Sequence, residues 1–279
     1  MVVAVASGKG GTGKTTIAVA LAQCAEEGVQ ILDCDVEEPN VHLFLRPSLH
    51  SREPVSLLMP EVDLDKCTLC GRCAEVCHYN ALAVIKERVL FFPELCHGCG
   101  ACSLACPREA IREVPREIGV VEEGRADGIL FVHGRLHPGE AMPSPIIRQV
   151  KAKKATVPRI VIDVSPGTAC PVAEALKGTD FCLLVTEPTP FGLSDLRLAV
   201  ELAGELGIPV GVVINRADLG DEGVERFCQE HSFPILLRLG FDRRIAEAYS
   251  RGIPLLPAAP ELGSDFRRLW EQIEGRAMG

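Results

Sequence analysis

Short runs of apolar, mostly β-branched residues recur along the chain and alternate with longer stretches in which apolar residues have helical spacing. The expected strands cover residues 2–6, 29–32, 159–162, 181–186, 210–214 and 235–239, and helix-compatible stretches cover residues 14–27, 193–206 and 222–230. Nearly continuous apolar strands that alternate with helices are typical of a parallel sheet with helices on both faces. The pattern therefore predicts an α/β fold with a doubly wound, mainly parallel sheet.

This alternation stops between about residues 60 and 117, where eight of the thirteen cysteines lie. Four of them recur 29 residues later, so that Cys67, Cys70, Cys73 and Cys77 are repeated as Cys96, Cys99, Cys102 and Cys106. Such self-similarity indicates an independent unit inserted into a host fold. We therefore expect an insert at residues 61–117 and a discontinuous host domain formed by residues 1–60 and 118–279. Within the host, residues 119–134 resemble a hairpin and residues 146–154 a helix.

The overall composition is that of a soluble globular protein, with 47% hydrophobic and 24% charged residues. A net charge of −9 argues against nucleic acid as a partner, because phosphate binding requires a basic surface. No secretory signal is expected at the N-terminus, and no apolar run approaches the roughly 18 residues of a membrane span. The chain is therefore expected in the cytoplasm, without membrane contact. In that reducing compartment, clustered cysteines indicate metal or redox chemistry.

Residues 8–15 form a glycine-rich sequence, GKGGTGKT, between the first expected strand and the first expected helix. This sequence satisfies G-x-x-x-x-G-K-[ST], the motif of a phosphate-binding loop (P-loop). Its glycines let backbone N–H groups point toward phosphates, the helix N-terminus adds positive potential, and Lys14 supplies a charge for the terminal phosphates. The hydroxyl of Thr15 is suited to bind Mg²⁺. We expect ATP and Mg²⁺ here, with the residues Gly8, Lys9, Gly10, Gly11, Thr12, Gly13, Lys14, Thr15 and Thr16.

Lys9 is not part of the general motif, and the sequence KGGTGKTT resembles the deviant-Walker ATPases, which include MinD, ParA, the Mrp-type proteins and the nitrogenase iron protein. The resemblance covers about residues 1–60 and 118–279. In that family, a lysine at the position of Lys9 reaches across a nucleotide-sandwiched dimer to the phosphates of the partner. The resemblance therefore implies an ATP-dependent homodimer in which Lys9 and Lys14 are catalytic.

Several residues at the ends of expected strands also match segments of that family. Residues 33–35 are similar to its D-x-D segment, which implies that Asp35 orients the attacking water or the Mg²⁺ shell and that Asp33 supports it. Residues 163–168, DVSPGT, resemble the switch segment, which implies that Asp163 holds a Mg²⁺-bound water and that the Gly167 N–H senses the γ-phosphate. Asn215 resembles the asparagine that recognises adenine. Solvated strand-end carboxylates and a capping asparagine are the alternatives.

The cysteine spacing C-x2-C-x2-C-x3-C occurs twice in the insert and resembles the bacterial two-cluster ferredoxins, in which the fourth cysteine of each run ligates the other cluster. The expected ligand sets of two 4Fe–4S clusters are Cys67, Cys70 and Cys73 with Cys106, and Cys96, Cys99 and Cys102 with Cys77. Zinc is the alternative for CxxC arrays, but the spacing of the eight cysteines favours clusters. Cys77 is followed by His78 where the ferredoxin pattern has proline, so the turn there is left open. His78 and His97 either tune a cluster or are solvated.

Five cysteines lie outside the insert. Four of them are expected to be buried small apolar residues: Cys24, Cys34, Cys182 and Cys228. Cys170 lies seven residues after Asp163, where the nitrogenase iron protein has a cluster ligand, so it is either a redox or interface residue or a structural thiol. Near the C-terminus, apolar residues at 266, 269, 270 and 273 have helical spacing, which favours a helix packed on the core over a membrane-binding one.

The whole architecture resembles MinD-superfamily ATPases that contain an inserted ferredoxin domain. It predicts an ATPase that couples a nucleotide-dependent dimer switch to electron transfer, with an unidentified protein as redox partner. The alternatives are an Mrp-like iron–sulfur cluster carrier and a MinD-like redox-sensing switch. Mrp-type carriers present a C-terminal CxxC pair that has no counterpart here, which favours resident clusters. The wider family also includes ATP-dependent amidases of cobyrinic acid, whose glutaminase domain is not expected in this chain.

Overall fold

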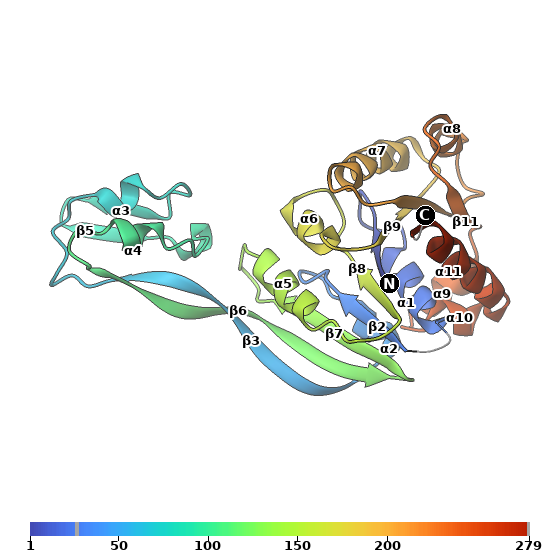
Figure 1. The fold of residues 1–279 in the computed structure, drawn as a ribbon, viewed down its shortest axis with the longest axis horizontal. Helices are drawn as coiled ribbons and strands as arrows, with labels where there is room; N and C mark the ends of the chain where they lie inside the picture. The colour runs from blue at the N-terminus through green and yellow to red at the C-terminus, as the bar shows by residue number, and fades with distance from the viewer. Residues whose placement is uncertain (26–27, 278–279) are drawn as a thin grey trace.

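The computed structural model describes residues 1–25 and 28–277, and its main body is built on one nine-stranded sheet (Figure 1). The strand order is β11-β10-β9-β1-β8-β2-β7-β6-β3. The strands are β1 (Val2–Ala6), β2 (Val29–Asp33), β3 (Ser48–Val62), β6 (Ile111–Ala126), β7 (Ile129–Leu136), β8 (Arg159–Asp163), β9 (Phe181–Thr186), β10 (Val210–Asn215) and β11 (Ile235–Leu239). From β11 to β7 neighbouring strands are parallel, whereas β6 and β3 are antiparallel to their neighbours. The predicted α/β fold with a mainly parallel sheet is confirmed.

Helices cover both faces of this sheet, as the continuous apolar strands predict. One face carries α1 (Lys14–Gln23), α2 (Val41–Leu45), α9 (Arg243–Tyr249), α10 (Leu255–Ala258) and α11 (Gly263–Ala277). The other carries α5 (Ser144–Ala152), α6 (Cys170–Leu176), α7 (Pro190–Glu205) and α8 (Gly223–Glu230). Alternate residues of one strand serve the two cores, so Ile31 packs on the first face and Leu32 on the second. The first helix is predicted to reach residue 27, but it ends at Gln23, with Cys24 as its C-cap, before residues 26 and 27, which lie outside the described residues.

The C-terminal helix α11 packs on the chain's own core, as expected. Its four apolar residues Phe266, Leu269, Trp270 and Ile273 are fully or almost fully buried. The indole N–H of Trp270 donates to the carbonyl of Leu21 at 2.8 Å, which attaches α11 to α1. No helix in the described part of the chain is long and apolar enough to cross a membrane.

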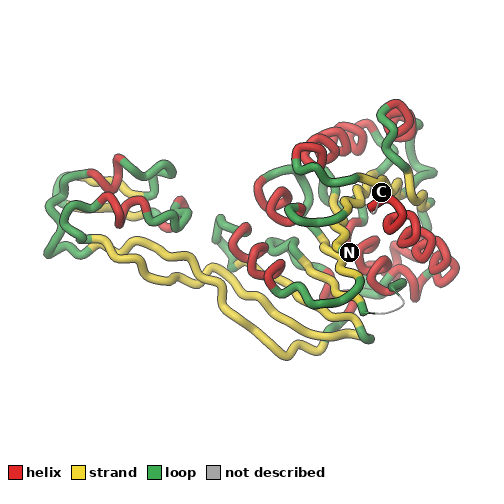
Figure 2. Tube along the Cα trace, viewed as in Figure 1, coloured by secondary structure: helices red, strands yellow, loops and turns green. Residues whose placement is uncertain are grey.

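Strands β3 and β6 pair along nearly their whole length, from Ser48 with Arg125 to Val62 with Ile111, and they leave the main body as a twisted ribbon (Figure 2). The hydrophobic pattern did not predict β3, because this edge strand contains Pro54 and Pro60 and is largely exposed. The predicted hairpin is present as β6 and β7. Its two-residue turn has positive φ at Asp127 and Gly128, as this hairpin type requires.

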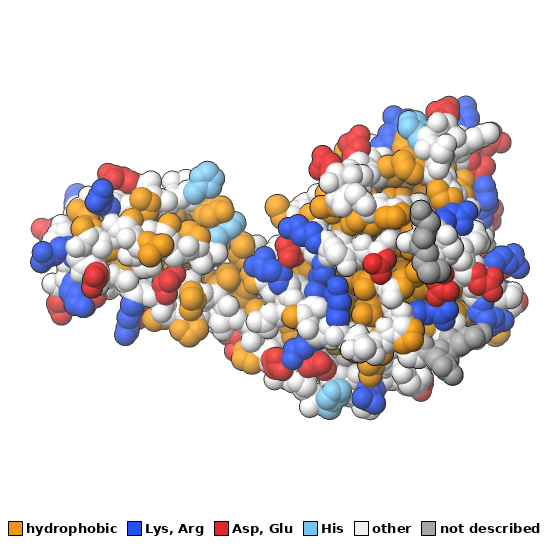
Figure 3. Space-filling view, viewed as in Figure 1, with side chains coloured by type: hydrophobic (Ala, Val, Ile, Leu, Met, Phe, Trp, Pro, Cys, Tyr) orange, Lys and Arg blue, Asp and Glu red, His pale blue; other side chains and the backbone are white. Residues whose placement is uncertain are grey.

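The ribbon carries a small distal unit, defined here as residues 63–110. It contains α3 (Arg72–Glu75), β4 (Leu82–Ile85), β5 (Arg88–Phe91), the 3-10 turn η1 (Pro93–Leu95) and α4 (Ala101–Ala105). Strands β4 and β5 form a separate antiparallel pair. The predicted limits of the insert, residues 61 and 117, fall within β3 and β6. Figure 3 shows the distal unit standing apart from the main body, with histidine side chains on the side that faces it.

The internal repeat of the distal unit extends to its backbone conformation. Left-handed residues occur at matching positions of the two halves, in the pairs Leu69 and Gly98, Gly71 and Gly100, and Asn80 and Glu109. The hydrophobic cluster that joins the unit to the ribbon is small and consists of Met59, Ala81 and Cys96, with Leu57, Cys77 and Phe91 packed against it. A unit with so few buried apolar side chains requires other cross-links for stability.

Candidate functional site

The P-loop, residues 8–15, follows β1 and runs into the start of α1, at the sheet edge where the carboxyl ends of the parallel strands meet. Two of its glycines have no space for a side chain. A Cβ atom on Gly8 would lie 2.3 Å from the carbonyl oxygen of Asp195, and one on Gly13 would lie 2.6 Å from Nδ2 of Asn215. Gly13 also has φ 93°, in the left-handed region. Lys14 follows at the start of α1 and is buried. The loop therefore has the close backbone packing that a phosphate cradle needs.

Buried carboxylates lie beside the P-loop, at the ends of β2 and β8. The hydroxyl of Thr15 donates to Oδ2 of Asp163 at 2.7 Å, and Oδ1 of Asp163 is buried without a hydrogen-bond partner among the described residues. Burial raises the pKa of Asp163 to about 7, although Lys14 and Thr15 act in the opposite direction. Burial also raises the pKa of Asp35, against the Lys14 charge. An unpaired carboxylate oxygen next to a threonine hydroxyl is a suitable environment for a hard cation with oxygen ligands.

Asp33 is fully buried and organises the chain segment that follows it. Its carboxylate accepts hydrogen bonds from the backbone N–H groups of Asp35, Asn40 and Val41, each at 3.1 Å. Burial, followed by the charge of Asp163, raises its pKa well above the usual range. Asp33 therefore holds the segment from Asp35 to the start of α2 in place, which is a supporting position.

Two groups predicted to contact nucleotide are hydrogen-bonded within the protein. The Gly167 N–H donates to the carbonyl of Ser7 at 2.9 Å, which ties the switch segment to the P-loop. The side-chain amide of Asn215 donates to the carbonyl of Thr12 at 2.8 Å. Both groups therefore lie at the P-loop, and contacts with a nucleotide would compete with these bonds. Thr16 is the third residue of α1 and lines a small cavity with Phe44.

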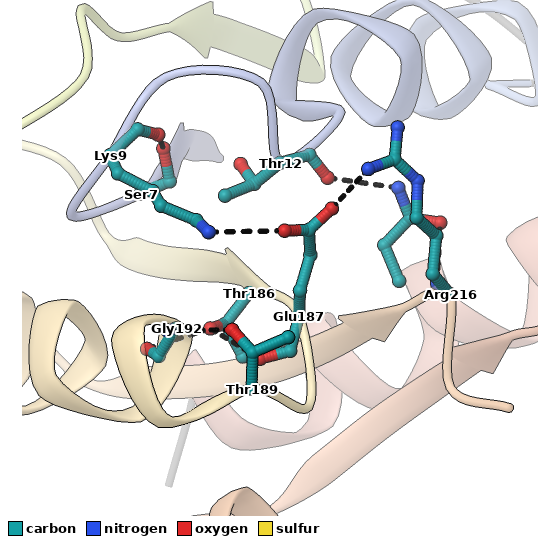
Figure 4. A network of polar contacts seen from close by, with 9 residues as sticks. Ser7, Lys9, Thr12, Thr186, Glu187, Thr189, Gly192 and Arg216 are labelled. Atoms are coloured by element: carbon teal, nitrogen blue, oxygen red, sulfur yellow. Dashed lines mark hydrogen bonds and ion pairs between the residues drawn. The ribbon is translucent and has the colours of Figure 1, made fainter. Parts of the chain in front are cut away.

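Lys9 forms an ion pair that the sequence did not predict (Figure 4). Its Nζ lies 3.1 Å from Oε2 of Glu187, and Oε1 of the same carboxylate accepts from Nη1 of Arg216 at 2.5 Å. Glu187 directly follows β9, and Arg216 directly follows β10. The sequence signal for this ion pair was the position of Glu187, a charged residue directly after an expected strand. Such a residue lies at the same edge of a parallel sheet as the P-loop.

A row of ionisable residues crosses the sheet from the ribbon to the nucleotide site. The strand register aligns Arg52 of β3 with Glu122 of β6, Glu122 with His133 of β7, and His133 with Asp33 of β2. Oε2 of Glu122 lies 2.9 Å from Nε2 of His133, and its Oε1 lies 3.7 Å from Arg52. Burial lowers the pKa of His133, although the hydrogen bond with Glu122 raises it. The ring of His133 also contacts His42 of α2 edge-on. This row could not be predicted from the sequence, because its residues come from four separate strands and only the register of the sheet places them side by side.

The eight repeated cysteines line two cavities in the distal unit. One is lined by Cys67, Cys70, Cys73 and Cys106, and the other by Cys77, Cys96, Cys99 and Cys102. Backbone N–H groups point at several sulfurs, with Ala81 donating to Cys77 Sγ and Ala110 to Cys106 Sγ, both at 3.2 Å. Thiolate ligands of iron–sulfur clusters are commonly hydrogen-bonded in this way. Four thiols around each cavity, with N–H groups directed at them, suit a cluster.

The turns after Cys77 and Cys106, the last cysteines of the two runs, are alike, although His78 stands where the ferredoxin pattern has proline. The Asn80 N–H donates to the Cys77 carbonyl, as the Glu109 N–H does to the Cys106 carbonyl. The departure from the ferredoxin pattern therefore leaves this turn unchanged. His97 stacks on Tyr79 with ring centroids 3.5 Å apart, beside the second cavity.

The other cysteines divide as the sequence suggested. Four are buried, namely Cys24, Cys34, Cys182 and Cys228. Burial raises the pKa of the Cys228 thiol to about 11 and that of Cys182 to about 12, so both remain protonated. Cys170 is exposed at the first residue of α6. Among the described residues, no three His, Cys, Asp or Glu side chains converge closely enough to hold a single metal ion.

The sequence profile described as the CobQ/CobB/MinD/ParA nucleotide binding domain matches residues 3–255. An uncharacterized protein of Methanocaldococcus jannaschii is 31% identical over 280 residues, covering 98% of this chain and 96% of its own. The crystal structure of the cell division ATPase MinD from Pyrococcus furiosus superposes with a TM-score of 0.60 at 22% identity, covering 98% of both chains, which shows a shared fold.

Two further relatives concern iron and sulfur. Ferredoxin-3 of Nostoc sp. is 33% identical over 75 residues, which cover 20% of this chain and 77% of that protein. An iron–sulfur cluster carrier protein of Pyrococcus abyssi is 23% identical over 274 residues, covering 91% of this chain and 78% of the carrier. Together with the P-loop and the two cysteine-lined cavities, these matches show that the chain belongs to the CobQ/CobB/MinD/ParA family of nucleotide-binding domains, as a P-loop ATPase with a ferredoxin-like insert.

Proposed function

We propose that this ATPase gates electron transfer through two 4Fe–4S clusters in its distal unit, in the cytoplasm, toward an unidentified redox partner protein. The continuity of the chain between the two sites carries the proposal. Strand β2 ends at Asp33, and it pairs with β7 in register from Gln30 to Asp33. A two-residue turn joins β7 to β6, which forms the ribbon with β3. A movement of the nucleotide-dependent segment after Asp33 therefore reaches the ribbon through paired strands.

The buried Glu122–His133 pair strengthens this connection. It links β6 of the ribbon to β7, and the ring contact between His133 and His42 extends the link to α2, whose first N–H groups bind Asp33. Breaking a buried, hydrogen-bonded pair is costly, so these elements should move together. Strand β3 alone spans about 50 Å at the rise of an extended chain, so a small rotation at its base gives a large displacement at the clusters.

The proposed cluster ligands are the two cysteine sets that line the cavities. When bound, 4Fe–4S clusters supply one-electron redox chemistry, and the N–H groups of Ala81 and Ala110 would stabilise the added negative charge on the cysteine sulfurs. At the nucleotide site, Thr15 and Asp163 are the proposed residues for Mg²⁺ and its bound water, and Asp35 the residue that orients the attacking water. Asn215 is the proposed adenine contact.

The active form is proposed to be an ATP-dependent homodimer in which Lys9 contacts the phosphates of the partner. Lys9 is the lysine of the loop that can reach another protomer, because its side chain is about one-third exposed, whereas Lys14 is buried. In the described monomer, Lys9 instead pairs with Glu187. Lys14→Ala should therefore abolish ATP binding, whereas Lys9→Ala should bind ATP as a monomer and lose hydrolysis. Normal hydrolysis by Lys9→Ala would refute the role of Lys9 in the partner site.

The decisive experiment measures the reduction potentials of the clusters with and without MgATP, and the ATPase rate of the oxidised and the reduced protein. Anaerobically purified protein should contain about eight irons per chain. Coupling predicts that MgATP shifts at least one potential and that reduction changes the ATPase rate. If MgATP leaves both reduction potentials unchanged and reduction leaves the ATPase rate unchanged, ATP does not gate electron transfer in this protein.

An iron–sulfur cluster carrier is the second candidate, because relatives with that name align over most of the chain. Four cysteines line each cavity, which favours clusters that are fully ligated and kept. Incubation with an apo-ferredoxin and MgATP separates the two functions, because a carrier would lose iron to the acceptor and an electron-transfer protein would retain it. A redox effect on the ATPase without electron delivery to any acceptor would instead indicate a redox-sensing switch.

A further inference from the structure

Glu187 occupies a fixed position between two cations, Lys9 and Arg216. Its backbone carbonyl accepts from the Thr189 N–H at 2.8 Å, and the Thr189 hydroxyl accepts from the Gly192 N–H at 3.0 Å, which caps α7. A Cβ atom on Gly192 would lie 2.2 Å from the Glu187 carbonyl oxygen, so the capping turn packs tightly. Figure 4 shows the side chain extending from this turn toward Lys9 and Arg216. The carboxylate is thus presented by a rigid turn.

The strand order explains why Glu187 reaches both cations. Strand β9 lies between β1 and β10 in the sheet. The residue after β9 therefore stands between the P-loop, which follows β1, and the segment Asn215–Arg216, which follows β10. The carboxylate connects the phosphate end of the expected nucleotide site with its base end, and its side chain is only 11% exposed.

We propose that Glu187 is a positioning residue for Lys9, which it holds within its own protomer until ATP-driven dimerisation transfers the lysine to the partner's phosphates. This inference rests on the proposed function, in which Lys9 acts across a dimer. The Glu187 carboxylate and the phosphates of another protomer compete for the ammonium group of Lys9, so we expect the ion pair to break when the dimer forms.

Arg216 keeps the release of Lys9 reversible. When Lys9 leaves, the carboxylate keeps its contact with the arginine, so no buried charge loses all its partners. If Lys9 were the partner of the mostly buried Glu187 carboxylate without Arg216, the ion pair would be tighter. Because the carboxylate is shared between Lys9 and Arg216, each of the two contacts is weaker. Arg216 therefore sets how easily Lys9 is released, and the two residues have opposite effects on dimerisation.

The test titrates a non-hydrolysable ATP analogue into the cluster-loaded full chain and follows dimerisation by light scattering. The quantity compared between the parent protein and its variants is the analogue concentration at half-maximal dimerisation. Glu187→Gln removes the ion pair and should lower this concentration about two- to fivefold, which is the scale of a partly exposed ion pair. Arg216→Gln should raise it. Glu61→Gln is the control, because it removes an ion pair with Arg112 at the end of the ribbon that carries the distal unit, and it should change nothing.

Binding of MgADP to each variant separates positioning from simple damage to the nucleotide site. The affinity of Glu187→Gln for MgADP should stay within about twofold of the parent, because Lys9 contacts phosphate only in the dimer. An unchanged or raised half-maximal ATP concentration for Glu187→Gln would overturn the inference, as would shifts of the same sign in both variants. If Glu187→Gln does not fold, the direction of the Arg216→Gln shift decides alone. A parent protein that stays monomeric with ATP would refute the proposed function as well, whereas a dimerising parent with unshifted variants refutes only the role of Glu187.

Discussion

Replacing Asp163 with asparagine should stabilise the nucleotide-free protein and at the same time abolish its ATPase activity. The carboxylate is buried beside Asp33 and Asp35, and one of its oxygens has no hydrogen-bond partner among the described residues. Such a group is unfavourable as an anion until a cation or a cation-bound water satisfies it. Asparagine keeps an acceptor for the Thr15 hydroxyl and removes the charge, but it cannot ionise to hold a Mg²⁺-bound water.

The size and sign of the effect follow from the pKa of Asp163, which burial raises from 3.8 to about 7. A carboxyl pKa that is higher in the folded state means that the stability present below pH 3.8 is lost as the pH rises through 7. The penalty that Asn removes is about 2 kcal/mol at pH 5 and about 4 kcal/mol at pH 8, at about 1.4 kcal/mol per pKa unit. The gain in unfolding free energy should therefore grow with pH.

Urea unfolding at both pH values, without nucleotide or Mg²⁺, measures this gain. Trp270 is the only tryptophan and is buried in α11, so its fluorescence reports on the main body. Asp127→Asn is the matched control, because this residue lies in the exposed β6–β7 turn and asparagine also tolerates its left-handed backbone. If Asp163→Asn destabilises the protein, or if the gain is equal at pH 5 and pH 8, then the buried charge of Asp163 does not lower the stability of the nucleotide-free protein.

Three further predictions test the cluster ligands, the P-loop and the core. Cys106→Ser should reduce the iron content from about eight to about four per chain and remove one of two electron paramagnetic resonance signals, whereas loss of neither cluster would contradict its assignment. Gly13→Ala should weaken ATP binding at least about tenfold in a fluorescence titration, because its backbone is left-handed and the new Cβ would meet Asn215; unchanged affinity would mean that the loop has room. Trp270→Ala should cost about 3–5 kcal/mol of unfolding free energy by circular dichroism, and a loss under 1 kcal/mol would contradict the tight packing of α11.

Much of the fold could be predicted because parallel strands are buried on both faces and leave continuous apolar runs in the sequence. The strands ending at Asp33 and Asp163 and the helix after Lys14 were found in this way. In the main sheet, β3 was not predicted, because it is exposed at the sheet edge, contains two prolines and has no apolar period. The long ribbon that β3 forms with β6 could not be predicted for the same reason.

The sequence by itself determined the P-loop and the two cysteine runs, because the residues of each motif lie close together in the chain. Only the tertiary structure decided that Glu187 pairs with Lys9 and Arg216, and that Glu122 and His133 align with Asp33. These contacts depend on strand order and register, which bring residues from distant segments to one sheet edge. Hydrophobic periodicity records whether a residue is buried, but it carries no information about which buried residue lies beside it.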